Sequence, residues 1–182
     1  MRRLFSLALP LAFAVALPAV ATWTGRPANE PAVAWSETKW PFLLDQWGTG
    51  RAFRCSGAGC DGLSLYLRPK IGFCNCATGV ADDAEVDRVA DIELLSQRYA
   101  PLGDGHAITV GWMSGRSRAY AVDGPMQARR TAMALAFNDK CDVVVATLVG
   151  DGAWPAEAER AALSLLNSGP VLRWAKAELN QQ

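Results

Sequence analysis

The stretch RTAMALAFNDKCDVVVATLVG, residues 130–150, holds two apolar runs separated by a short polar segment. We expect a strand in each run and a hairpin turn near Asp139 and Lys140. A second pair of strands is predicted at 106–113 and 117–124, joined across Ser114, Gly115 and Arg116. Consecutive hairpins of this kind favour an antiparallel sheet.

The rest of the chain adds two strands and two helices. Short strands are predicted at 50–55 and 63–71, and in the latter leucines alternate with Ser64, Tyr66 and Arg68. Helices are predicted over 82–97 and 155–168, and the tail at 170–180 fits a helix or a last strand. The expected fold class is therefore α+β, an antiparallel sheet of about five to six strands in hairpins with two main helices packed on it.

The N-terminus has the pattern of a secretory signal peptide over residues 1–21, with Arg2 and Arg3 before an apolar run and small residues at 19–21. The alternative is an uncleaved membrane anchor at 4–20. Residues 22–39 are expected to form a flexible leader, and 40–182 a single α+β domain. Without the two arginines, 16 basic residues face 18 acidic ones, which argues against nucleic acid as a partner. Membrane contact is expected only if 4–20 stays uncleaved.

Five cysteines follow the apolar N-terminal run, and an odd number leaves at least one outside an intramolecular disulfide. Cys55 and Cys60 bracket a glycine-containing turn, which favours a local disulfide. Cys141 is expected to pair with either Cys74 or Cys76, and the other thiol is left free. The expected compartment is the periplasm or the outside of the cell, where disulfides persist.

Cys74 and Cys76 also permit a different chemistry. In an extended segment they would point to the same side, where two thiolates suit Cu(I) and a free thiol beside a disulfide suits exchange. The sequence FCNC resembles the Cys-x-Cys of periplasmic copper-delivery proteins, over three positions only. Because Met113, Met126, Met133 and His106 are scattered, no cofactor is expected, with copper as the alternative.

No catalytic residue is assigned. His106 has Asp104 before it and Ser114 and Ser117 after it, but no nucleophile-elbow motif accompanies them. A partner-binding surface is predicted on the 106–124 hairpin, because arginines and aromatic side chains are common at protein interfaces. Its residues are Trp112, Arg116, Arg118 and Tyr120.

The stretches KWPFLLDQWGTGRAFRC (39–55), KIGFCNCATGVADDAEVDRVAD (70–91) and LAFNDKCDVVVAT (135–147) are similar to a group of uncharacterised exported proteins of proteobacteria. The order of elements also resembles the PsbP/Mog1-type sandwich. The resemblance implies export but no catalytic residues. We expect an exported, disulfide-stapled accessory or binding protein without enzymatic activity, whose partner is another envelope protein. The alternatives are a thiol–disulfide or Cu(I)-handling protein and a membrane-anchored subunit of an envelope complex.

Overall fold

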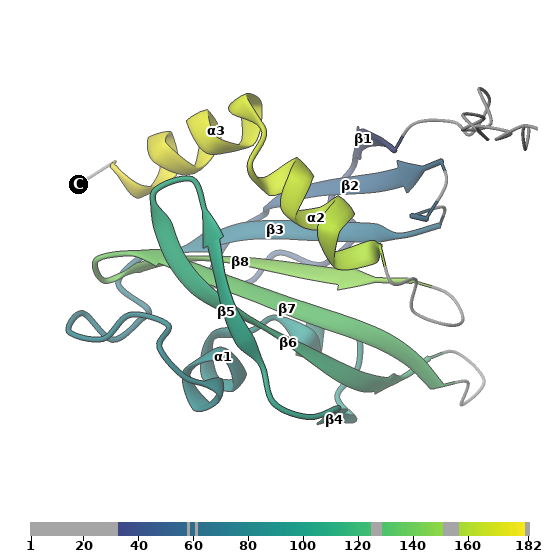
Figure 1. Cartoon of the computed structure of the whole chain (residues 1–182), viewed down its shortest axis with the longest axis horizontal. Helices are drawn as coiled ribbons and strands as arrows, with labels where there is room; N and C mark the ends of the chain where they lie inside the picture. Colours follow the sequence, from purple (N-terminus) through teal and green to yellow (C-terminus); the bar gives the residue numbers. More distant parts are fainter. Residues whose placement is uncertain (1–32, 58, 61, 125–128, 151–156, 181–182) are drawn as a thin grey trace, which may run out of the picture.

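Figure 1 shows the computed structural model, which describes residues 33–57, 59–60, 62–124, 129–150 and 157–180. In these residues eight strands form one antiparallel sheet, ordered β1-β2-β3-β8-β7-β6-β4, with β5 also paired to β6. The strands are β1 (Ala34–Thr38), β2 (Arg51–Ser56), β3 (Ser64–Lys70), β4 (Tyr99–Pro101), β5 (His106–Val110), β6 (Met113–Asp123), β7 (Arg129–Asp139) and β8 (Asp142–Val149).

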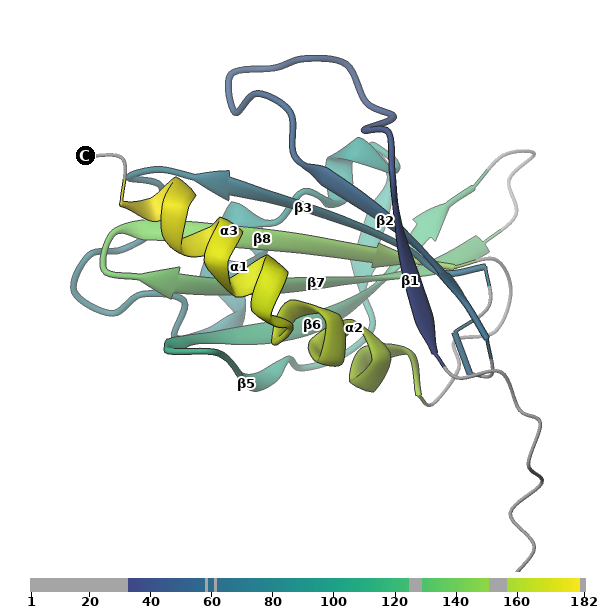
Figure 2. The ribbon, with the colours of Figure 1, turned by 90° about the horizontal axis from the view of Figure 1, so that it is seen from above.

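Helices cover both faces of this sheet. Figures 1 and 2 show α2 (Ala158–Leu166) and α3 (Gly169–Leu179) crossing one face. On the other face lie α1 (Asp83–Val89) and the 3-10 turn η1 (Ile92–Leu94). Strand β7 contributes side chains to the hydrophobic cores on both faces of the sheet. Its large side chains Met133, Leu135 and Phe137 face α2 and α3, and the alanines between them face α1.

The predicted sheet of five to six strands with two main helices is wrong. The sheet has eight strands and the described chain three short helices, with 41% of the described residues in strands and 22% in helices. Residues 34–38, which the sequence places in the flexible leader, form β1 and pair with β2. Both β1 and the three-residue β4 are mostly exposed, so neither carries the alternation of apolar residues that marks a strand in sequence.

The helix predicted over 82–97 ends at Val89. It begins as its acidic start indicates, with the Asp82 side chain accepting from the backbone N–H of Glu85 at 2.8 Å. Ala90 then turns to an extended conformation (ψ 156°), which carries Asp91 toward the sheet. Asp91 pairs there with Arg68 and Lys70, which lie on β3 more than 20 residues earlier in the chain.

The first hairpin turns at Gly111 and Trp112, and its predicted turn at 114–116 is wrong. Gly111 has a φ of 58°, which glycine adopts without strain and a hairpin turn requires. Gly115 instead lies within β6, where a Cβ atom would collide with the carbonyl oxygen of Ala136 on β7. The second hairpin turns at Lys140 and Cys141, next to the predicted position.

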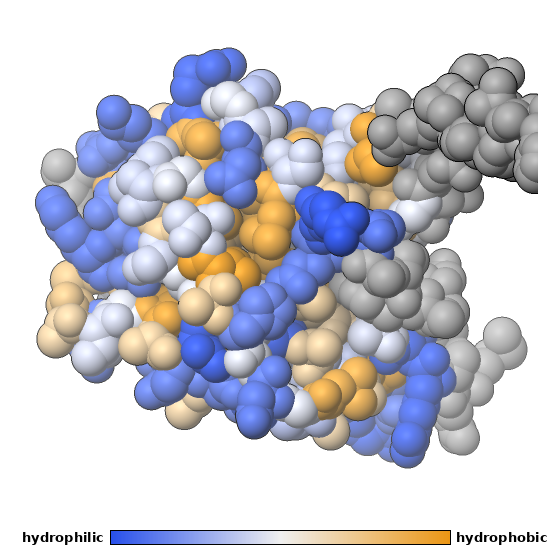
Figure 3. Space-filling model, in the orientation of Figure 1, coloured by the Kyte–Doolittle hydropathy of each residue, from blue (hydrophilic) through white to orange (hydrophobic). Residues whose placement is uncertain are grey.

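The tail forms α3, with Pro170 in its first turn. The predicted signal peptide (1–21), the leader up to 32, and Pro155 lie outside the described residues. In the part of the chain that is described, every helix is too short or too polar to span a membrane. Figure 3 shows the face that carries α2 and α3, where apolar residues lie in separate patches between polar ones.

Candidate functional site

The described cysteines form two disulfides, Cys55–Cys60 and Cys76–Cys141, and Cys74 is the one left free. The local disulfide joins the two ends of the glycine-containing turn, as predicted. The second joins the 71–79 segment to the β7–β8 turn. The backbone N–H of Cys74 links the same two segments, donating to the Cys141 carbonyl oxygen at 3.1 Å. The sequence left Cys74 and Cys76 as alternatives for this bond, and the structure selects Cys76.

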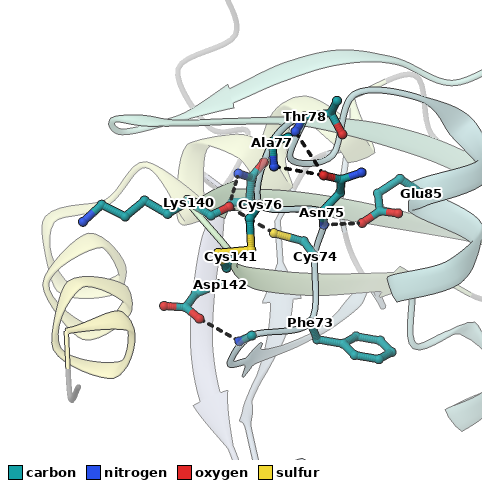
Figure 4. Close-up of a disulfide and its surroundings, with 12 residues drawn as sticks. Phe73, Cys74, Asn75, Cys76, Ala77, Thr78, Glu85, Lys140, Cys141 and Asp142 are labelled. Carbon is teal, nitrogen blue, oxygen red and sulfur yellow. Dashed lines mark hydrogen bonds between the residues drawn. A yellow bond between two sulfur atoms is a disulfide. The ribbon is translucent and has the colours of Figure 1, made fainter.

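Cys74 and Cys76 do not present two thiolates on one side of a strand. Figure 4 shows the Cys74 thiol pointing to the carbonyl oxygen of Lys140, to which it donates at 3.2 Å. Around Asn75 the chain turns, with the Asn75 side chain accepting from the backbone N–H of Ala77. Burial, together with Glu85 and Asp142 nearby, raises the pKa of Cys74 to about 11, so the reactive thiolate is scarce at neutral pH.

The described residues hold no cluster of three or more His, Cys, Asp or Glu side chains placed to ligate a metal. Cu(I) binding at Cys74 and Cys76 stays a prediction, and the described residues place no group of further ligands beside these two cysteines.

A pocket of about 520 Å³ opens on the α1 face of the sheet, next to the cysteine segment. We call it the Lys70 pocket. It is framed by the loop before β2, by β3, by the end of α1, by η1 and by β4. Its lining residues are Asp45, Gln46, Trp47, Arg68, Lys70, Phe73, Asp87, Arg88, Ala90, Asp91, Glu93, Leu94 and Tyr99.

The floor of the Lys70 pocket is a buried ionic cluster. The Arg68 guanidinium donates to both carboxylate oxygens of Asp91, from Nε at 2.6 Å and from Nη2 at 2.7 Å. Lys70 Nζ lies 2.8 Å from Asp91 Oδ1 and donates to the Val89 carbonyl oxygen at 2.6 Å. Burial lowers the pKa of Lys70 and Asp91 partly offsets that effect. Such buried charges persist only when they are paired and hydrogen-bonded.

Aromatic rings form one wall above this floor. Trp47 and Phe73 lie 4.6 Å apart between ring centroids, and Lys70 Nζ is 5.6 Å and 5.4 Å from their centroids. The Arg88 guanidinium lies over the outer side of the cluster, 4.7 Å from the Phe73 centroid. These distances fall within the range of cation–π attraction. Seven of the thirteen lining residues are charged, so the pocket is mainly polar, with the rings of Trp47 and Phe73 as its apolar wall. Charged groups that converge on one cavity can fix the orientation of a small polar ligand.

Arg68 also reaches the entrance of the pocket. Its Nη1 donates to both carboxylate oxygens of Asp45, at 2.8 and 2.9 Å, and Asp45 also accepts from the backbone N–H of Trp47. Burial opposes ionisation of Asp45, but the bonds from Arg68 and Trp47 outweigh it and lower the pKa of this carboxyl. The Arg68 guanidinium therefore links the buried floor to the loop that closes over it.

The predicted partner-binding residues are not one exposed surface. Arg116 donates to Asp83 and to the Gly105 carbonyl oxygen, both at 2.7 Å, and Arg118 pairs with Asp87 at 2.7 Å. Tyr120 is buried, and its hydroxyl donates to Asp87 at 2.6 Å. These three side chains hold α1 against the sheet. Trp112 alone is half exposed, at the β5–β6 turn, and its role in partner binding stays a prediction.

His106 and Ser117 do come together, with Glu159 of α2 in place of Asp104. One carboxylate oxygen of Glu159 accepts from Ser117 Oγ at 2.7 Å and lies 2.9 Å from His106 Nε2. Ser117 Oγ also lies 3.2 Å from His106 Nε2, so the serine and the carboxylate meet the same ring nitrogen, whereas in a nucleophilic triad the carboxylate holds the opposite one. Ser117 is also fully buried, so this set fixes α2 to the sheet and offers no accessible nucleophile.

No protein-family model, no curated protein and no solved structure matches this chain. The resemblance to exported proteobacterial proteins and to the PsbP/Mog1-type sandwich therefore stays a prediction.

The residues of the Lys70 pocket were missed in the sequence. Asp91 lies in an acidic run that reads as a solvated helix face, although only 6% of the residue is exposed. The available signal was in β3, where Arg68 and Lys70 occupy alternate positions on the same side as Tyr66. The same pattern is found on a solvated face of a strand, so it did not distinguish a buried pair of cations from an exposed one.

Proposed function

We propose that the protein is an exported accessory or binding protein of the periplasm, without enzymatic activity, that holds a small molecule in the Lys70 pocket. The observation that carries the proposal is the composition of this pocket, an ionic floor of Arg68, Lys70 and Asp91 beneath the rings of Trp47 and Phe73. Two disulfides support a location outside the reducing cytoplasm, where such bonds persist.

The test is an NMR chemical-shift titration of ¹⁵N-labelled protein with three probes of similar shape. Phenylacetate, 2-phenylethanol and 2-phenylethylamine each carry one ring and differ in charge. We expect at least one probe to shift the resonances of Trp47 and Phe73 in a saturable manner. Ala90→Trp, which fills the pocket, should abolish the response, whereas Ala84→Trp, which adds the same ring at an exposed site on α1, should leave it intact. Absence of binding by all three probes, or equal binding to both variants, would refute the proposal.

The thiol–disulfide or Cu(I)-handling alternative has less support, because Cys76 is bonded to Cys141 and the Cys74 thiol is buried. A Cu(I) titration against a competing chelator tests it, and we expect no stoichiometric retention of copper. The alternative of a membrane-anchored envelope subunit concerns residues 4–20, which lie outside the described chain. The intact mass of protein recovered from cells distinguishes the anchored chain from the cleaved one, since cleavage after Ala21 leaves a chain that begins at Thr22.

A further inference from the structure

We propose that the ligand of the Lys70 pocket carries a carboxylate, which binds Arg68 Nη1 in exchange for the side chain of Asp45. The inference rests on the proposed function and specifies its ligand. In the structure Asp45 occupies the position that the ligand's carboxylate would take, with both oxygens on Nη1 at 2.8 and 2.9 Å. Asp91 takes Nε and Nη2 of Arg68, so Nη1, with its two N–H groups, is the part of the guanidinium left for a second carboxylate.

The two carboxylates bound to Arg68 differ in how firmly they are held. Asp91 is bonded to Arg68 through two nitrogens and also to Lys70, and its side chain is 7% exposed. The side chain of Asp45 is 38% exposed and meets Arg68 through one nitrogen. Water and solutes therefore reach Asp45, whereas Asp91 is enclosed. Asp45 is the partner that can be replaced without dismantling the floor.

The loop that carries Asp45 is held at its two ends by aromatic contacts, Trp40 and Phe42 on Tyr66 and Trp47 on Phe73, and is exposed between them. Residues 39–50 contain no helix or strand, and the side chains of Leu43 and Leu44 next to Asp45 extend into solvent, with 91% and 75% of these residues exposed. The exposure of this middle part leaves space for the Asp45 side chain to turn away from Arg68 while the aromatic contacts at both ends stay in place.

The charge balance of the floor determines which ligand can replace Asp45. When Asp45 leaves, the two cations Arg68 and Lys70 face the single carboxylate of Asp91, so one positive charge is left unpaired. An unpaired buried cation is costly, and an anion from the ligand removes that cost. Two further acids line the pocket: Asp87 is paired with Arg118 at 2.7 Å and accepts from the Tyr120 hydroxyl, and Glu93 is hydrogen-bonded to Tyr99.

The decisive variant is Asp45→Asn. The amide oxygen of asparagine can still accept from the backbone N–H of Trp47, so the local turn is kept while the competing charge is removed. Asp104→Asn is the matched control, because it removes one exposed acid that does not line the pocket. Thermal melting of both variants establishes first that they are folded.

We expect Asp45→Asn to bind phenylacetate at least tenfold more tightly than the wild-type protein does, with 2-phenylethanol unchanged and 2-phenylethylamine weakened. Asp104→Asn should match the wild type within twofold. In the wild-type protein alone, phenylacetate should bind more tightly than 2-phenylethanol, which keeps the inference testable if Asp45→Asn does not fold.

Equal affinity of the wild type for all three probes, or weaker phenylacetate binding by a folded Asp45→Asn, would overturn the carboxylate inference and leave the pocket in place. The absence of any binding would instead refute the proposed function, and this inference with it.

Discussion

The Cys74 thiol donates to the carbonyl oxygen of Lys140 at 3.2 Å, one residue before the cysteine that is bonded to Cys76. The spare thiol is thus enclosed beside a disulfide, and burial raises its pKa from 9.0 to about 11. In the native protein at pH 7.5 we expect iodoacetamide to label Cys74 at least a hundredfold more slowly than in urea. Mass spectrometry of the alkylated protein measures this. Fast labelling of the native protein would show that the thiol is accessible.

The same raised pKa makes stability depend on pH. Because the folded protein disfavours the thiolate, the contribution of Cys74 is fully present below about pH 9 and is lost as the pH rises toward 11. Between pH 8 and pH 10.5 the wild type should lose about 2 kcal/mol of unfolding free energy relative to Cys74→Ser, which has no thiol to ionise. Urea denaturation of both proteins at the two pH values measures the difference. Parallel pH profiles would contradict the assignment of a buried thiol.

The two disulfides should differ in their effect on stability. Cys76 and Cys141 are 65 residues apart, whereas Cys55 and Cys60 are separated by five. By loop-closure entropy, Cys76→Ala/Cys141→Ala should cost about 4 kcal/mol and Cys55→Ala/Cys60→Ala about 2 kcal/mol. Urea titrations of the two double variants, each serving as the control for the other, give the comparison. A larger loss in the Cys55/Cys60 variant would contradict this order.

The buried cluster beneath the pocket should respond strongly to loss of its acid. Asp91→Asn leaves Arg68 and Lys70 without their shared carboxylate, and we expect a loss of about 3–5 kcal/mol. Glu37→Gln is the control, because Glu37 pairs with Arg51 at the surface and its side chain is 51% exposed. It should cost under about 1 kcal/mol. Chemical denaturation compares the two, and similar losses would mean that the Asp91 cluster is solvated.

The anchoring of α1 depends on Tyr120. Burial and the Asp87 carboxylate hold the pKa of this tyrosine well above its usual range, because its hydroxyl stays a donor to Asp87. Tyr120→Phe should cost about 2 kcal/mol and speed hydrogen exchange in residues 83–89. Tyr99→Phe, at a residue that is 37% exposed, should have a smaller effect. Unchanged exchange in Tyr120→Phe would show that other contacts hold the helix.

Three patterns between near neighbours were predicted correctly. The β7–β8 hairpin, the helix start at Asp82 and the Cys55–Cys60 disulfide all depend on residues close together in the chain. The strand count failed because β1 and β4 are stabilised by pairing with β2 and β6, and their own side chains are mostly exposed. The first hairpin turn was predicted at Gly115 and lies at Gly111, because a glycine in sequence indicates a turn in either case. Gly115 is needed instead for the close approach of β6 to β7.

By itself the sequence determined the antiparallel hairpins, one local disulfide, and the fact that at least one of five cysteines stays outside an intramolecular disulfide. Only the tertiary structure decided that Cys76 pairs with Cys141, that α1 ends at Val89, and that Asp91 meets Arg68 and Lys70 beneath a pocket. The physical reason is distance along the chain. A charged residue has the same local pattern whether it faces water or a partner twenty residues away, and only the folded sheet brings that partner within hydrogen-bonding distance.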